Sequence, residues 1–175
     1  MAGPDDFKWA HAFTRRWEKG DHRPTLADPN PTRDGITQRF YDALVRKYGY
    51  PVSSVFLLTK ETIDSIYERV IWRDAHGPDL PRLVAACHYD CSVNMSRPRA
   101  TRILQRALGI TADGLWGPET QYAAVSAKQH EAVKRMCGWR ECEYTELVAH
   151  NPRLKPVLQG WLNRVSALRE YLGVG

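Results

Sequence analysis

Four acidic side chains lie at the end of the first amphipathic segment of the chain and in the stretch that follows it. Glu18 lies at the break, directly after the residues FTRRW. A polar run rich in Asp, Pro, Asn and Thr follows, and it contains Asp21, Asp28 and Asp34. A carboxyl group held over a cleft can act as a general acid or base, and a second polar group nearby can complete such a site. The same residue types also serve as ordinary turn and helix-end residues on a protein surface.

The elements that hold these side chains are predicted to be helices. Apolar residues recur at the three- and four-residue spacing of an amphipathic helix along most of the chain. The region 21–58 interrupts this pattern with the turn-forming dipeptides DP, NP, DG and YP. We therefore expect a mainly α-helical fold with a long irregular loop or small β-hairpin after the first helix. The predicted helices cover about residues 4–18, 38–49, 59–75, 81–97, 100–109, 118–138 and 152–172.

Length and composition predict a single compact molecule. The chain has 175 residues, of which 43% are hydrophobic, and this is enough for one proper core. We expect two lobes packed as one unit, residues 1–97 and residues 98–175, and a monomer.

Charge and hydropathy narrow the range of partners. The formal charge of +5 favours anionic partners, but Lys and Arg are scattered and not massed as in a nucleic-acid-binding surface. No basic start precedes an apolar run, and no stretch approaches the roughly 18 apolar residues of a spanning helix. We expect a chain made in the cytoplasm without a signal peptide, with no stable membrane insertion and no nucleic-acid partner.

The four cysteines could in principle contribute to a metal site. Cys87 and Cys91 are separated by three residues, and Cys137 and Cys142 by four. Zinc knuckles usually have tighter spacing with turn residues inside it. Buried free thiols are the favoured interpretation, and we predict no metal and no cofactor.

Several irregular motifs, in order, resemble one family. They are DPNPTRDGIT after Glu18, then IYERVIW, LPRLVAACHYDCSVN, ILQRALGITADGLWGPET and NPRLKPVLQGWLNRV. Together they resemble the glycoside hydrolase family 108 lysozymes, which are phage endolysin N-acetylmuramidases, over about residues 7–172. The resemblance implies a lysozyme-like helical fold. The fourth motif also resembles short helical modules that bind peptidoglycan.

The resemblance implies that Glu18 is the catalytic acid. The family pattern places two glycines and an aromatic residue after this Glu and ends the loop with Gly-Ile-Thr. Gly20 and the ending at residues 35–37 match. Lys19 replaces a glycine and Asp21 replaces the aromatic residue, so the chain departs from the family pattern directly beside the acid.

Cleavage of a glycosidic bond needs a protonated carboxylic acid and a second group that supports the sugar cation or activates water. For this second group we rank Asp28 first, then Asp21, then Thr32. Thr37 could orient a water molecule or a sugar hydroxyl. Turn and capping roles explain the same residues equally well.

Other side chains could line a substrate cleft. Asp90 and Asn94 lie one helical turn apart, so they share a face and either line the cleft or tie helices together. Aromatic side chains could stack on sugar rings, although most at helical spacing belong to a core. The aromatic candidates are Trp72, Tyr89 and Trp116.

The resemblance implies an endolysin that cleaves the β-1,4 bond between N-acetylmuramic acid and N-acetylglucosamine in bacterial peptidoglycan after holin-type release. Two alternatives remain. A lytic transglycosylase would use the same Glu18 without water, and a non-catalytic protein would bind the cell wall or nucleic acid.

Overall fold

The computed structural model describes residues 3–23 and 29–175, and it confirms a mainly α-helical fold. Its described helices are α1 (Pro4–Trp17), α2 (Gln38–Tyr48), α3 (Lys60–Ile66), α4 (Arg82–Met95), α5 (Arg97–Leu108), α6 (Pro118–Ser126), α7 (Gln129–His150) and α8 (Lys155–Leu172). Short 3-10 turns cover Val55–Leu57, Gly77–Asp79 and Pro152–Leu154, and a π-helical turn, Tyr67–Trp72, extends α3.

The region after α1 contains a small antiparallel sheet. Strands β1 (Asp21–His22), β2 (Thr32–Arg33) and β3 (Ile36–Thr37) pair in the order β1-β2-β3. The DG dipeptide forms the two-residue turn between β2 and β3, where Asp34 has φ +45° and Gly35 has φ +81°. Such left-handed residues match the twist of a tight hairpin. The predicted loop or hairpin is therefore a three-stranded meander.

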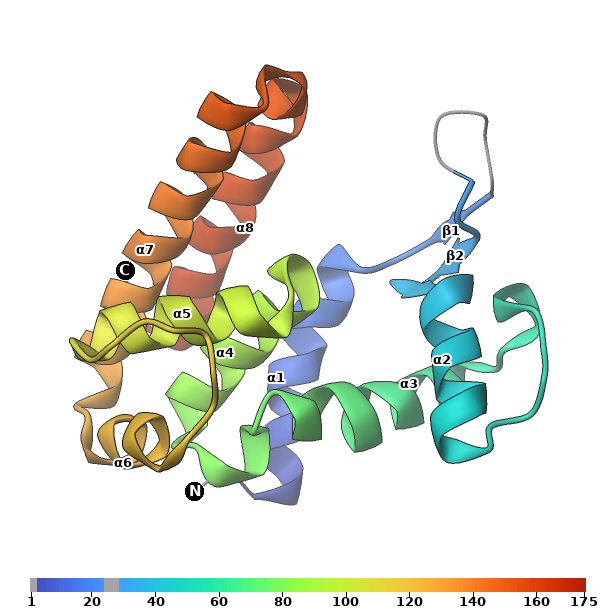
Figure 1. Cartoon of the computed structure of the whole chain (residues 1–175), viewed down its shortest axis with the longest axis horizontal. Coiled ribbons are helices and arrows are strands. Elements are labelled where there is room, and N and C mark those ends of the chain that lie inside the picture. Colours follow the sequence, from blue (N-terminus) through green and yellow to red (C-terminus); the bar gives the residue numbers. More distant parts are fainter. Residues whose placement is uncertain (1–2, 24–28) are drawn as a thin grey trace.

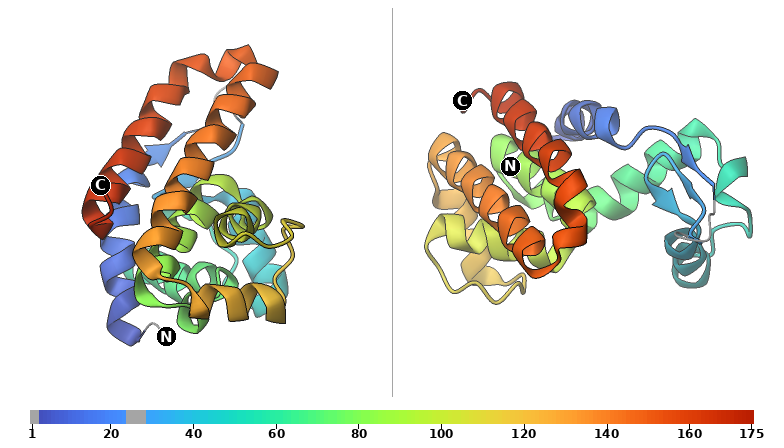
Figure 2. Two further views of the ribbon diagram at one scale, coloured as in Figure 1. Left: turned by 90° about the vertical axis from the view of Figure 1, so that its left-hand side faces the viewer. Right: turned by 90° about the horizontal axis from the view of Figure 1, so that it is seen from above.

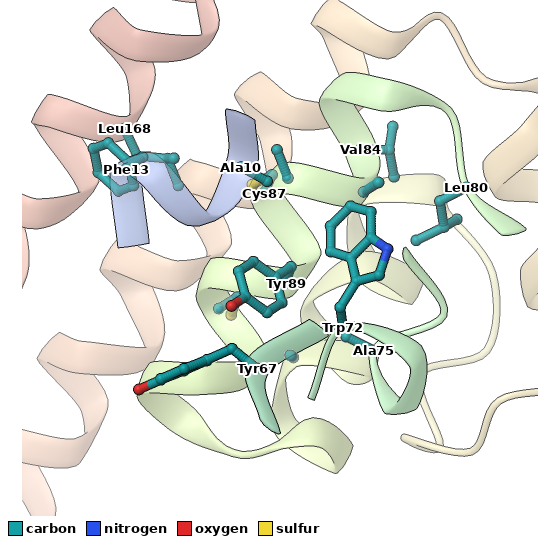
Figure 3. Close-up of a cluster of buried hydrophobic side chains, with 14 of the residues drawn as sticks. Ala10, Phe13, Tyr67, Trp72, Ala75, Leu80, Val84, Cys87, Tyr89 and Leu168 are labelled. Atoms are coloured by element: carbon teal, nitrogen blue, oxygen red, sulfur yellow. The ribbon is translucent and has the colours of Figure 1, made fainter. Parts of the chain in front are cut away.

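Helix α4 lies at the centre of the molecule. Its residues from Val84 to Cys91 are all buried, because α1, α5 and α7 pack around it. The sheet and α2 lie on one side of α1 and α4, and α5 to α8 lie on the other (Figures 1 and 2). Figure 3 shows aromatic and aliphatic side chains of α1, the π-helical turn, α4 and α8 meeting in this core. The division into lobes 1–97 and 98–175 stays a prediction.

Two predicted helices differ from the structure. The single helix expected over 118–138 is two helices, because Ala127 and Lys128 adopt extended backbone angles between α6 and α7. Neither residue is a helix breaker, so the pattern gave no warning. Helix α7 then continues to His150 and forms a long antiparallel pair with α8 that projects from the body (Figure 1). Val157, an apolar residue of α8 in this projecting pair, is consequently 45% exposed.

No helix among residues 3–23 and 29–175 has the length and apolar character needed to cross a membrane.

Candidate active site

Glu18 ends α1 and lies at the junction between the helical body and the sheet. Its backbone leaves the helical region with φ −106° and ψ 21°, and Gly20 follows with φ +106° before β1 begins. The Glu18 side chain is 19% exposed, so it is partly shielded and still reachable from solvent. The sequence therefore places this carboxylate at the end of a rigid helix.

The turn between β2 and β3 packs against Glu18. A Cβ atom on Gly35 would overlap the Tyr67 hydroxyl and lie 3.0 Å from Glu18 Oε2, so glycine permits this close approach. Asp34 holds the turn in place, because its backbone N–H donates to the Gly20 carbonyl and its carboxylate accepts from the Gly20 N–H, both at 3.0 Å. Asp34 thus has a structural use.

The hydroxyl of Tyr67 lies on the same side of the turn. It donates a hydrogen bond of 2.9 Å to the Asp34 carbonyl. Burial, and then the negative charge of Glu18, raise the pKa of Tyr67 well above its usual value. Tyr67 therefore stays a neutral hydrogen-bond donor next to Glu18.

An ion pair connects Glu18 to the last helix. Nη1 of Arg164, on α8, donates to Glu18 Oε1 at 2.6 Å. The same guanidinium donates from Nη2 to Asp90 Oδ1 at 2.7 Å, and Asp90 Oδ2 accepts from Arg140 Nη1 at 2.7 Å. The Thr14 hydroxyl adds a 3.0 Å hydrogen bond to Asp90. These four side chains join α1, α4, α7 and α8 behind Glu18.

Asp90 remains charged inside this network. Burial alone would raise the pKa of its carboxyl group, but the positive charges of Arg140 and Arg164 outweigh burial and hold the pKa below its usual value. Buried charges persist when they are paired and hydrogen-bonded in this way.

A groove begins beside Glu18. Its volume is about 330 Å³, which is within the range of small-molecule sites, and two of its lining residues, Gly35 and Tyr67, lie next to the carboxylate. Apolar walls and a few polar groups suit a sugar, which has both apolar and hydroxylated faces. The lining residues are Gly35, Phe40, Tyr67, Ile71, Asp74, Ala75, Ser92, Val93, Arg97 and Pro98.

A larger cavity, about 560 Å³, lies at the other end of α1 and includes Gly3 and Phe7. A rise of 1.5 Å per helical residue puts Phe7 roughly 16 Å from Glu18. That cavity is therefore far from Glu18, whereas the groove at Gly35 lies beside it.

The predicted second groups lie in and around the sheet. Asp21 is exposed on β1, with its carboxylate 4.0 Å from Arg33 Nε. The Thr32 hydroxyl, on β2, donates to the Asn30 carbonyl at 3.3 Å. Thr37 pairs with Thr32 across β2 and β3, and it caps α2 by accepting the Phe40 N–H at 3.2 Å. Asp28, ranked first, lies outside the described residues.

Three residues predicted to bind substrate are instead buried. Tyr89 and Trp72 are 0% and 4% exposed and pack edge to face within the core (Figure 3), so neither presents a ring to a sugar. Asp90 is 0% exposed and serves as the counterion of two arginines. The alternative role of tying helices together is the one the structure gives it.

The other two residues predicted to bind substrate from this set, Asn94 and Trp116, lie nearer the surface. Asn94 accepts a hydrogen bond from the Tyr144 hydroxyl, which ties α4 to α7. Trp116 stacks on His76, with ring centroids 4.0 Å apart, so one of its faces is already occupied.

Three residues of the candidate site were not predicted from the sequence: Arg164, Tyr67 and Phe40. Arg164 had a recognisable signal, because it is a charged residue within the apolar face that Trp161, Val165 and Leu168 define. A buried charge of this kind requires an acidic partner. Tyr67 and Phe40 had no such signal, because an aromatic residue at helical spacing predicts only burial.

The cysteines do not cluster with other side chains that could bind a metal ion. Cys87, Cys91 and Cys137 are buried free thiols, and Cys142 is exposed. Over the described residues no group of three or more His, Cys, Asp and Glu side chains could hold a metal ion.

A helical body and a small sheet, with a carboxylate at their junction beside a groove, fit a lysozyme-like fold. Residues 12–96 match the glycosyl hydrolase 108 family, and residues 99–166 match a family described as a predicted peptidoglycan domain. These matches confirm the resemblance seen in the sequence and identify the protein as a glycoside hydrolase. Together they support a peptidoglycan hydrolase.

A solved structure supports the fold over nearly the full chain. The structure of Brucella abortus SagA is 26% identical and has a TM-score of 0.77, and the match covers 97% of this chain and 95% of that one. A comparison with curated protein sequences gives no match.

Proposed function

We propose that the protein hydrolyses the β-1,4 bond between N-acetylmuramic acid and N-acetylglucosamine in peptidoglycan, with Glu18 as the general acid. The placement of Glu18 carries this proposal. It ends α1 beside a groove of about 330 Å³, within the segment that matches glycosyl hydrolase 108.

In the proposed reaction Glu18 donates its proton to the glycosidic oxygen as the bond from that oxygen to the sugar C1 breaks. Water then adds its hydroxyl to C1, and its remaining proton restores the acid. Proton donation requires the acid form of Glu18, which gives up the charge-assisted contact with Arg164 during the cycle. The neutral hydroxyl of Tyr67 stays beside the carboxyl group throughout.

Asp28, Asp21 and Thr32 remain our ordered proposals for the group that supports the sugar cation or directs water. Asp21 and Thr32 lie on neighbouring parts of the sheet that begins just after Glu18.

The decisive experiment compares the wild-type protein with Glu18→Gln on purified peptidoglycan. Loss of the general acid should reduce clearance by about 100-fold or more. Glu146→Gln, an exposed position on α7, is the matched control and should retain full activity. If Glu18→Gln clears peptidoglycan as well as the wild type, or if neither protein clears it, the assignment of the acid fails.

Mass spectrometry of the products separates two chemistries. Hydrolysis leaves reducing N-acetylmuramic acid ends, whereas a lytic transglycosylase leaves anhydro-muramic ends. A non-catalytic protein would release no fragments. Binding to DNA that salt weakens, with no affinity for the wall, would favour the nucleic-acid alternative.

We also propose that the protein acts as a monomeric phage endolysin that reaches the wall after holin-type release. This role rests on the resemblance to the family 108 lysozymes. Expression in bacteria should cause lysis only when a membrane-permeabilising protein is co-expressed. Lysis without that second protein would argue against this role and leave the proposed bond cleavage untouched.

A further inference from the structure

Arg164 reaches Glu18 from a distant part of the chain. The two residues are 146 positions apart in the sequence, and their side chains meet at 2.6 Å. Arg164 lies in the segment that matches a predicted peptidoglycan domain, and Glu18 lies in the segment that matches glycosyl hydrolase 108. The ion pair therefore spans both segments.

The guanidinium of Arg164 is held in one orientation. It is 4% exposed, and its Nη2 and Nε atoms both donate to the carboxylate of Asp90, at 2.7 and 3.2 Å. Asp90 is itself fixed by Arg140. A planar guanidinium bound on one edge in this way presents its remaining Nη1–H groups in a defined direction, and here they face Glu18.

We propose that Arg164 is a positioning residue for the active site. Held in place by Asp90, it fixes the carboxylate of Glu18 beside the groove. This inference rests on the proposed function of Glu18. The C-terminal segment then completes the active site in addition to any contact it makes with the wall.

Other charged groups around Glu18 are engaged elsewhere or lie farther into solvent. Arg15, on α1, pairs with Asp64, and Lys19 is exposed. The carboxylate of Asp34, on the turn, accepts the Gly20 N–H, and Tyr67 is neutral. Because Arg164 is buried and in direct contact, its charge is screened less by solvent than that of Lys19.

The test is the steady-state kinetics of Arg164→Met on soluble peptidoglycan fragments. Without Arg164 the Glu18 carboxylate is no longer held in one place, so kcat should fall by about 10- to 100-fold. KM should stay near the wild-type value, because Arg164 is not among the residues that line the groove. Arg164→Lys keeps the charge without the planar fork, so it should restore only part of kcat.

Arg169→Met is the matched control. Arg169 lies on the same helix and pairs with Glu141 at 3.0 Å, so its removal should leave kcat unchanged. The ¹³C chemical shift of the Glu18 carboxyl group in wild type and variants reports the loss of the Arg164 contact without relying on activity.

Several outcomes would overturn the inference. A folded Arg164→Met protein with wild-type kcat would show a merely structural role. If that variant does not fold, an Arg164→Lys protein with wild-type kcat would have the same consequence. Activity of Glu18→Gln would instead refute the proposed function, whereas an inactive Glu18→Gln together with wild-type kcat in Arg164→Met would refute this inference alone.

Discussion

Asp90 and Arg140 form an ion pair at 2.7 Å in which both side chains are 1% exposed. Removing one partner of such a pair leaves the other charge buried. We expect Asp90→Asn to lower the free energy of unfolding by about 3–5 kcal/mol. The exposed pair between Lys8 and Asp5 is the comparison, and Lys8→Met should cost less than about 1 kcal/mol. Urea denaturation measures both, and equal costs would contradict the argument.

Gly35 and Gly49 allow a matched test of the turn beside Glu18. Both have positive φ, +81° and +70°, so alanine at either position should cost about 1–2 kcal/mol of stability. A Cβ at Gly49 meets nothing within 4 Å, whereas one at Gly35 overlaps Tyr67 and approaches Glu18. Gly35→Ala should therefore also reduce kcat roughly 10- to 100-fold, because the acid is displaced. The measurement is turnover at a temperature where both variants are folded. Equal turnover would contradict the close packing.

His88 predicts how stability depends on pH. Its ring is fully buried on α4, with Nδ1 2.9 Å from the Ala75 carbonyl, and burial lowers its pKa to about 4. At intermediate pH the unfolded chain therefore binds a proton that the folded protein does not. Above about pH 6.5 the neutral, buried His88 does not reduce the free energy of unfolding. As the pH falls from about 6.5 to about 4, the free energy of unfolding decreases by roughly 3 kcal/mol. Burial also lowers the pKa of His11, which acts in the same direction.

The measurement is the free energy of unfolding from pH 4 to pH 8. His88→Asn cannot take up this proton and should flatten the profile, while exposed His130→Asn should leave it unchanged. A profile in which His88→Asn keeps the wild-type slope would assign the pH dependence to other groups.

Much of the fold was predictable because it depends on local patterns. The turn residues of DG and the apolar spacing of α1 act over a few residues, so their positions follow from the sequence alone. The break between α6 and α7 did not follow, because Ala127 and Lys128 carry no breaking signal and tertiary packing sets their backbone.

Within the candidate site, only the position of Glu18 was predictable. Glu18 could be placed because it follows a helix and matches a family pattern. Its contact with Arg164 depends on two helices that meet across 146 residues, and spacing along the chain carries no such information. Asp90 and Asn94 were correctly placed on one helix face, because that follows from local spacing. Whether this face lines a cleft or lies in the interior stayed open, because it depends on how distant helices pack.

Gln105 explains how the loop that precedes α6 keeps its shape. Asp113 and Gly114 of this loop both bind the buried amide of Gln105 at 2.8 Å. Gln105→Leu leaves the Gly114 N–H buried without its acceptor, so it should cost about 1–3 kcal/mol. Gln159→Leu, at an exposed position on α8, should change stability by less than about 0.5 kcal/mol. Thermal unfolding compares them, and similar costs would contradict a structural role for this amide.

Phe40 tests whether the groove beside Gly35 holds the substrate. Phe40 and Tyr48 lie on the same helix, but Phe40 lines the groove and Tyr48 is 48% exposed at the far end. Phe40→Ala removes apolar surface that a sugar ring would cover, so KM should rise by roughly tenfold. Because Glu18 and its contacts are unchanged, kcat should stay near the wild-type value. Tyr48→Ala should alter neither constant. Kinetics on soluble peptidoglycan fragments measure both, and a Phe40→Ala enzyme with an unchanged KM would place the substrate elsewhere.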